Sequence, residues 1–169
     1  MKTLIITLIS FLSLFSQGDY SSKEHQDAMK KLQIFIGEWE GESWYMGRDG
    51  KQSSTMKEVL QYKLDKTAIL VEGKGYKGDK LIHNAMALIT YNAYTKVYNF
   101  KSHLSNGRST DAVMIVKSDK EFEWSFETPN GMKFRYEIKF TDNTWTEEGF
   151  MARDGKNFVK FMGMNLKRV

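Results

Sequence analysis

The spacing of hydrophobic and polar residues changes once along the chain, at Gly37. From Ser22 to Ile36, apolar residues recur every three or four positions, as on one face of an amphipathic helix. After Gly37, apolar and polar residues alternate, which is typical of a half-buried strand. In residues 133–140, for example, aromatic and aliphatic residues alternate with lysine, arginine and glutamate. The pattern predicts a short helix followed only by strands.

Short turn sequences divide the region after Gly37 into strands. The expected strands lie at residues 38–47, 53–63, 67–76, 80–91, 96–104, 109–117, 121–128, 132–140, 144–152 and 157–167. Glycine, asparagine and aspartate gather between them, as in Arg48-Asp49-Gly50 and Ser105-Asn106-Gly107. Sequential hairpins form a meander, and a long meander leaves unpaired edges unless it closes. We therefore expect an all-β fold, a closed up-and-down antiparallel β-barrel of about ten strands with a short N-terminal helix; an immunoglobulin-type sandwich is the alternative.

Residues 1–18 have the pattern of a secretory signal peptide. Lys2 precedes an apolar run at residues 4–15, and Ser16 and Gly18 place small residues where signal peptidase cleaves. The run is shorter than the roughly 18–20 residues that a membrane-spanning helix needs. We expect cleavage after Gly18, a single mature domain at residues 19–169 without a stable membrane span, and a periplasmic or secreted location. An uncleaved membrane anchor is the alternative.

Composition and motifs exclude several classes of function. The chain has no cysteine, so disulfides, thiolate catalysis and cysteine-bound metals are excluded. The formal net charge is only +4, and lysine and arginine do not form the stripe expected of a nucleic-acid-binding surface. No nucleophile elbow of the Gly-x-Ser-x-Gly kind and no Walker A sequence is present. We therefore favour a binding protein over an enzyme.

The segment from Leu32 to Glu42 contains the sequence Ile36-Gly37-Glu38-Trp39-Glu40-Gly41 directly after the predicted helix. This segment resembles the start of calycin-type (lipocalin-like) barrels, and most of all an uncharacterised bacterial family of lipocalin-like proteins. Further matches to that family are Val71-Glu72-Gly73, Leu88-Ile89-Thr90-Tyr91-Asn92 and Thr95-Lys96-Val97-Tyr98. The resemblance implies that Trp39 plugs one end of the barrel. A basic residue of the last strand, Lys167 or preferably Arg168, would then stack on its ring.

Nitrobindin-like haem proteins share this strand count and opening motif. They bind iron through a histidine in the C-terminal part of the chain, whereas the histidines here are His25, His83 and His103. We therefore expect no haem and no other cofactor or metal.

Methionine and aromatic residues in the predicted strands favour a cavity for an irregular apolar ligand. The expected ligand-binding residues are Met56, Glu58, Leu70, Glu72, Met86, Met114, Trp124 and Tyr136. Glu58 and Glu72 interrupt apolar runs, so they either line a polar pocket, where Lys74 or Arg135 would pair with them, or are simple outward charges. We predict an exported barrel that binds a small apolar or amphipathic molecule, as a monomer or weak dimer.

Two alternatives stay open. Glu58, Glu72 and one of the neighbouring His83 and His103 could provide acid–base catalysis for an isomerase, cyclase or hydrolase, if they converge in one cavity. A partner-binding role would instead require a filled interior and an apolar patch outside.

Overall fold

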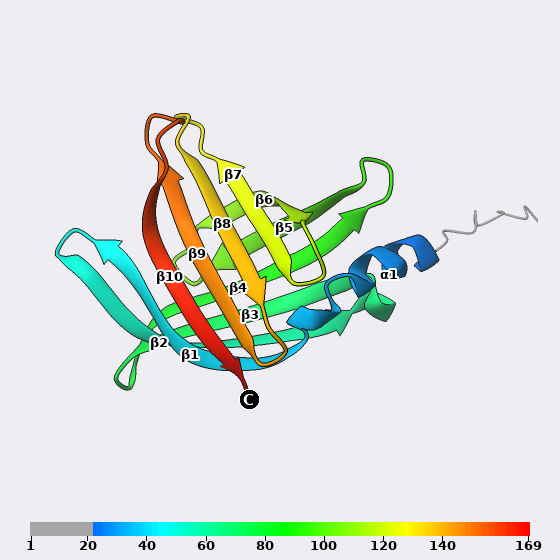
Figure 1. Cartoon of the computed structure of the whole chain (residues 1–169), viewed down its shortest axis with the longest axis horizontal. Helices are drawn as coiled ribbons and strands as arrows, with labels where there is room; N and C mark the ends of the chain where they lie inside the picture. The colour runs from blue at the N-terminus through cyan, green and yellow to red at the C-terminus, as the bar shows by residue number, and fades with distance from the viewer. Residues whose placement is uncertain (1–21) are drawn as a thin grey trace, which may run out of the picture.

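The computed structural model describes residues 22–169, which form a closed antiparallel barrel (Figure 1). The helical elements are α1 (Ser22–Lys30), η1 (Gln33–Phe35) and η2 (Leu64–Lys66). The strands are β1 (Gly37–Gly47), β2 (Gly50–Lys63), β3 (Ala68–Lys77), β4 (Lys80–Asn92), β5 (Val97–Leu104), β6 (Ser109–Val116), β7 (Glu121–Glu127), β8 (Lys133–Phe140), β9 (Thr144–Ala152) and β10 (Val159–Arg168). Each strand pairs with the next in the chain, and β10 closes the barrel against β1. The predicted fold class is confirmed.

The N-terminal helix is shorter than the sequence predicts. A helix was expected over residues 22–36, but α1 ends at Lys30 and a 3₁₀ turn follows at Gln33–Phe35. This turn drives Leu32 and Phe35 into the barrel, where their exposed fractions are 0% and 2%. Gly37 then enters β1 with φ of +131°, a value that a residue with a side chain rarely adopts. Apolar residues keep a helical spacing as far as Ile36, so the sequence pattern does not reveal that the helix ends at Lys30.

Helix α1 covers one end of the barrel, which we call the closed end. The Tyr98 hydroxyl donates a hydrogen bond to the Ala28 carbonyl oxygen at 2.8 Å, and the Tyr62 hydroxyl donates to that of Met29 at 3.3 Å. Lys96 forms an ion pair with Glu24. In Figure 1, α1 lies at the same end as η2 and the β4–β5 turn. The hairpin turns β1–β2, β3–β4, β5–β6, β7–β8 and β9–β10 form the opposite end, which we call the open end.

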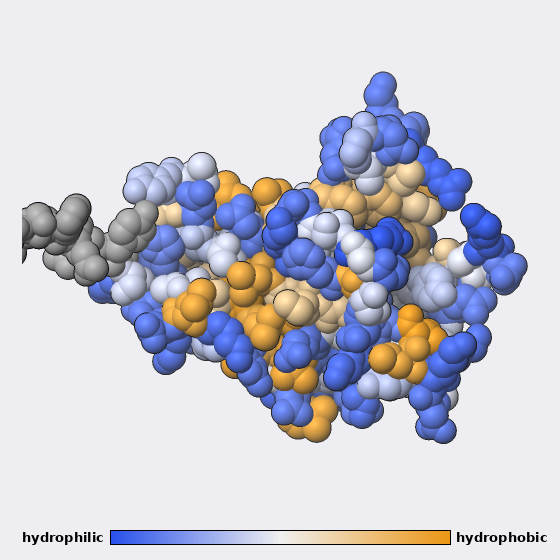
Figure 2. All heavy atoms as spheres, turned by 180° about the vertical axis from the view of Figure 1, so that it is seen from behind, coloured by the Kyte–Doolittle hydropathy of each residue, from blue (hydrophilic) through white to orange (hydrophobic). Residues whose placement is uncertain are grey.

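The side of the molecule seen in Figure 2 is mainly polar, with apolar side chains in several separate groups. In residues 22–169, no helix is long and apolar enough to cross a membrane. The predicted signal peptide, residues 1–18, lies outside the described part of the chain.

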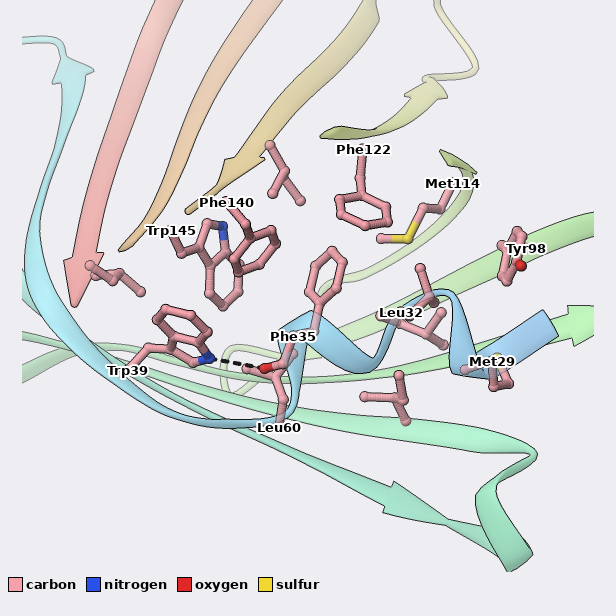
Figure 3. Packing of buried hydrophobic residues seen from close by; sticks show 14 of the residues in the cluster. Met29, Leu32, Phe35, Trp39, Leu60, Tyr98, Met114, Phe122, Phe140 and Trp145 are labelled. Carbon is pink, nitrogen blue, oxygen red and sulfur yellow. Dashed lines mark hydrogen bonds between the residues drawn. The ribbon is translucent and has the colours of Figure 1, made fainter. Parts of the chain in front are cut away.

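The core of the closed end is built around Phe35 and Trp39 (Figure 3). The Phe35 ring meets the rings of Phe122, Phe140 and Trp145 edge-on, with centroids 4.6–5.7 Å apart. Trp39 is 1% exposed, and its indole N–H donates to the Phe35 carbonyl oxygen at 2.9 Å. These contacts fill this end of the barrel with packed aromatic side chains.

Arg168 lies over Trp39 from the last strand. Its guanidinium carbon is 4.0 Å from the centre of the indole ring, a cation–π distance. The same guanidinium donates hydrogen bonds to the carbonyl oxygens of Ile36 at 2.6 Å and Ile34 at 2.9 Å. Arg168 therefore ties the C-terminal strand to the segment that leads into β1. The geometry is the one that the calycin resemblance implies for this pair.

Candidate functional site

The interior of the barrel changes from packed to accessible along its axis. On β1, the inward-facing side chains run from Trp39, which is 1% exposed, to Tyr45, which is 46% exposed. On β7, Phe122 is fully buried, whereas Trp124 and Phe126 are half-buried although they point inward. Solvent therefore reaches the interior from the open end, and the candidate site is this accessible half of the barrel.

Stacked aromatic rings line one wall of the site. The rings of Trp124 and Tyr136, which pair across β7 and β8, are 3.7 Å apart and nearly parallel. Phe126 stacks on Phe134 at 4.7 Å in the next inward row of the same two strands. Phe100 stacks on the Trp124 ring at 4.7 Å from β5. We call these five residues the aromatic wall. Their flat faces suit an apolar or aromatic molecule.

Two glutamates lie deeper in the interior. Within residues 22–169, Glu58 and Glu147 are the buried charged side chains, with exposed fractions of 8% and 7%. Glu58, on β2, faces inward beside Trp39 of β1 and Gly73 of β3. Glu147, on β9, faces inward with its cross-strand partner Met164 of β10. Buried carboxyl groups are costly unless they are paired or protonated.

The hydrogen bonds of the two glutamates differ. Glu147 accepts a hydrogen bond from the Trp124 indole N–H at 3.1 Å. Glu58 has no hydrogen-bond or ion-pair partner within the described chain, and its carboxyl oxygens keep some contact with solvent. Its carboxyl group lies against Gly73, where an added Cβ would come within 2.7 Å of Oε1. The buried Trp145 indole N–H also has no hydrogen-bond acceptor in the described structure. The site thus contains an unused acceptor group and an unused donor.

Burial controls the protonation of both acids. Burial and, to a smaller extent, the negative charge of Glu147 together raise the pKa of Glu58 to about 8. Burial also raises the pKa of Glu147 to about 7, although the indoles of Trp124 and Trp145 oppose the rise. Near neutral pH, the pair therefore holds at least one proton for part of the time.

The two candidate histidines do not meet. His83 points inward from β4, is half-buried, and has a pKa lowered by burial. His103 points outward and is exposed, since it pairs with the outward-facing Met86. In residues 22–169, no group of three or more histidine, aspartate or glutamate side chains is arranged to hold a metal ion.

The structure divides the predicted ligand-binding residues between the two faces of the barrel. Inward-facing are Met56, Glu58, Met114, Trp124 and Tyr136. Outward-facing are Leu70, Glu72 and Met86, so these three residues do not line the interior. Glu72 is exposed, and the predicted convergence of Glu58, Glu72 and a histidine does not occur. Neither Lys74 nor Arg135 pairs with Glu58, because both lie on the outer face.

The physical reason lies in small residues on the inward faces of β3 and β4. The inward row of β3 ends in Gly73 and Gly75, and that of β4 contains Ala85 and Ala87. A Cβ at Gly73 or Gly75 would clash with the side chains of Glu58 or Met56 from the neighbouring strand. Only the part of each inward row near the closed end carries large apolar residues, such as Ile69 and Ile89, so near Glu72 and Met86 residue size does not identify the inner face.

Sequence reasoning missed Glu147. It lies in Thr144-Trp145-Thr146-Glu147-Glu148-Gly149, where two adjacent glutamates obscure the alternation. Glu147 lies on the same face of β9 as Trp145 and Met151. An acidic residue on this apolar face could have identified Glu147 as a candidate from the sequence.

A concavity lies at β4, β5, β6 and β7, lined by outward-facing residues together with Phe100 and Phe126 of the aromatic wall. It has a volume of about 660 Å³, and its lining includes Met86, Leu88 and Val113. These side chains are 53%, 39% and 44% exposed. An ion pair between Lys101 and Asp111, 3.1 Å long, lies beside them. We call this concavity the outer groove.

Comparisons with known proteins support the fold. No protein-family model and no curated protein matches the sequence. The structure is similar to the crystal structure of Rv2717c from M. tuberculosis, with a TM-score of 0.64 and 12% sequence identity. The match covers 84% of this chain and 97% of that chain. At this identity the similarity establishes a shared barrel fold.

Proposed function

We propose that this chain is an exported, lipocalin-like protein that binds one small apolar or amphipathic molecule inside the barrel. The observation that carries the proposal is the aromatic wall, whose side chains point inward yet remain half-buried. A core that only stabilised the fold would bury these rings as fully as Phe35 and Phe122. Covering them with a ligand would gain about 25 cal/mol for each Å² of apolar surface removed from water.

The shape of the barrel supports the same proposal. Helix α1 and the packed core block one end, while the aromatic wall leads from the open end toward Glu58 and Glu147. A ligand would therefore enter from the open end and meet a polar group at its deepest point. This gradient from apolar to polar suits an amphipathic molecule.

Binding of 2-naphthylmethanol, a neutral aromatic probe, tests the proposal. We expect one site per chain, with a negative heat-capacity change measured by calorimetry at several temperatures. We also expect quenching of tryptophan emission, because Trp124 belongs to the aromatic wall. Trp124→Phe should remove most of the quenching while Trp39, Trp44 and Trp145 continue to emit. Absence of binding by this probe and by its charged analogues would refute the proposal.

The outer groove favours a second candidate function, the binding of a partner protein through Met86, Leu88 and Val113. Exposed apolar residues that adjoin one another are typical of interaction surfaces. Substitutions in the groove separate the two candidates, as set out at the end of the Discussion.

A further inference from the structure

We propose that the ligand carries a basic nitrogen, and that the barrel holds it as an ammonium group between Glu58 and Glu147. This inference rests on the proposed function, because it requires a ligand in the interior. It names the chemical class of that ligand as an aromatic or apolar amine. The argument has three steps, concerning the unused hydrogen-bonding capacity, the charge of the interior and the position of the aromatic wall.

Glu58 supplies the first step. Glu58 is 8% exposed and has no hydrogen-bond or ion-pair partner in residues 22–169, so what remains of solvent contact is all that its carboxyl oxygens have. A buried polar group without a partner is unfavourable, and native proteins rarely retain one. The charge of Glu147 acts on Glu58, and we place the ligand nitrogen between the two acids, where its three N–H donors serve both. Glu147 accepts one protein hydrogen bond, from Trp124, and a carboxylate can accept several.

The charge of the interior supplies the second step. The titratable residues at inward-facing strand positions are Tyr45, Glu58, Tyr62, His83, Tyr91, Tyr98, Tyr136 and Glu147. At the inward positions of the described strands, the one lysine or arginine is Arg168, opposite Trp39, and its guanidinium donates to the carbonyl oxygens of Ile34 and Ile36 rather than to the two acids. Burial lowers the pKa of His83. Arg108, which acts on Tyr136, is exposed in the β5–β6 turn. The protein itself therefore offers no cation to the acids, and a ligand can supply one.

The aromatic wall supplies the third step. The Trp124 indole donates to Glu147, so the polar and aromatic parts of the site are joined by one side chain. A molecule whose amine reaches the two acids would place its apolar body against the rings of Trp124 and Tyr136. Aromatic faces also attract an ammonium group directly. A fatty acid in the same position would bring a third carboxylate to two buried acids, which is electrostatically unfavourable.

The arrangement has a measurable consequence for protons. An ammonium group stabilises the ionised form of a neighbouring carboxyl group. At neutral pH, binding of the amine as its cation should release a proton from the acid pair to the buffer. A neutral ligand in the same site should release none. Calorimetry in two buffers of different ionisation enthalpy counts the protons released.

Three probes with one naphthyl body test the inference: 2-naphthylmethylamine, 2-naphthylmethanol and 2-naphthoate. At pH 7.5 we expect the amine to bind about tenfold more tightly than the alcohol, and the carboxylate more weakly than either. Glu58→Gln should lower the amine affinity about tenfold and leave the alcohol affinity unchanged. Glu72→Gln, which alters an exposed glutamate of β3, is the matched control and should change neither.

The outcomes separate the two proposals. If the alcohol binds as tightly as the amine, or the amine releases no proton, the amine inference is wrong while interior binding stands. If none of the three probes binds, both proposals are wrong. The comparison of the three probes on the unaltered protein decides the matter even if Glu58→Gln does not fold, and Glu147→Gln provides a second variant.

Discussion

At the scale of single residues, Glu58 and Glu147 couple the stability of the fold to pH. The pKa of Glu58 rises from 4.5 to about 8 on folding, and that of Glu147 rises to about 7. Between pH 4.5 and 7, the unfolded chain therefore loses protons that the folded chain keeps. By linkage, the free energy of unfolding falls across this window, by about 1.4 kcal/mol per pH unit for each group. This sign is opposite to that of a salt-bridged carboxylate.

We predict that Glu58→Gln flattens this pH dependence. The amide stays neutral in both states, so the variant should be more stable than the unaltered protein at pH 8 and close to it at pH 5. Urea unfolding at a series of pH values measures the difference. Glu72→Gln should keep the original slope, because Glu72 is exposed. A stability of the unaltered protein that increases from pH 5 to pH 8 would contradict the assignment of neutral buried acids.

A second prediction at this scale concerns the plug. Trp39→Ala should lower the free energy of unfolding by about 3–5 kcal/mol, the usual range for deleting a buried large aromatic side chain. Trp39 contacts Phe140 and Trp145 and holds the Phe35 carbonyl, so neighbouring groups lose packing and a hydrogen bond. Chemical denaturation measures the loss, with the more exposed Trp44→Ala as the control. A loss below about 1 kcal/mol would show that Trp39 is peripheral.

At the scale of elements, α1 acts as a fixed cover for the closed end. Tyr98→Phe removes the hydroxyl that donates to the Ala28 carbonyl oxygen, and leaves that acceptor without this donor. We predict a loss of stability of about 0.5–1.5 kcal/mol, the net value of one hydrogen bond, because the Ala28 carbonyl oxygen still accepts from the Lys31 N–H. In Tyr98→Phe, amide hydrogen exchange should speed up more in α1 than in β8, relative to the unaltered protein. Unchanged exchange in α1 would mean that the helix is held by its apolar contacts alone.

The strands were predictable from the sequence, but the face that each strand presents to the interior was predictable only in part. Turn residues set the strand boundaries, and β8 alternates cleanly because its inward row contains Phe134, Tyr136, Ile138 and Phe140. On β3 and β4 the inward rows carry glycine and alanine, so volume and hydrophobicity no longer identify the buried face. Their space is filled by side chains from neighbouring strands, and single-strand periodicity contains no information about neighbours.

The candidate site was likewise predictable only where the alternation within a single strand was sufficient. Trp124 and Tyr136 were predictable because regular alternation places them on the apolar face of β7 and β8. The pairing of Glu58 with Glu147 was not, since β2 and β9 are far apart in the sequence and come together only through barrel closure. For Glu72, β3 by itself left an inward and an outward position open, and the pairing with β2 and β4 places it outward.

At the scale of the whole molecule, the barrel is asymmetric along its axis and across its wall. The closed end contains most of the fully buried side chains, so it supplies most of the packing energy. The open end has half-buried aromatic residues that can be altered with less loss of packing. The outer groove adds an apolar surface whose lining includes Phe100 and Phe126 of the aromatic wall but not Glu58, Glu147, Trp124 or Tyr136. Stability, interior binding and outer contacts should therefore respond to different substitutions.

The last prediction uses this separation to decide which surface binds the ligand. Trp124→Leu removes a ring of the aromatic wall and should weaken 2-naphthylmethanol binding about tenfold, as expected for losing about 1.4 kcal/mol of contact. Met86→Glu places a charge in the outer groove and should leave the dissociation constant unchanged, because Met86 points away from the interior. Calorimetric titration of both variants, with circular dichroism to verify folding, makes the comparison. If Met86→Glu weakens binding and Trp124→Leu does not, the probe occupies the outer groove, and the partner-binding surface becomes the better account of this protein.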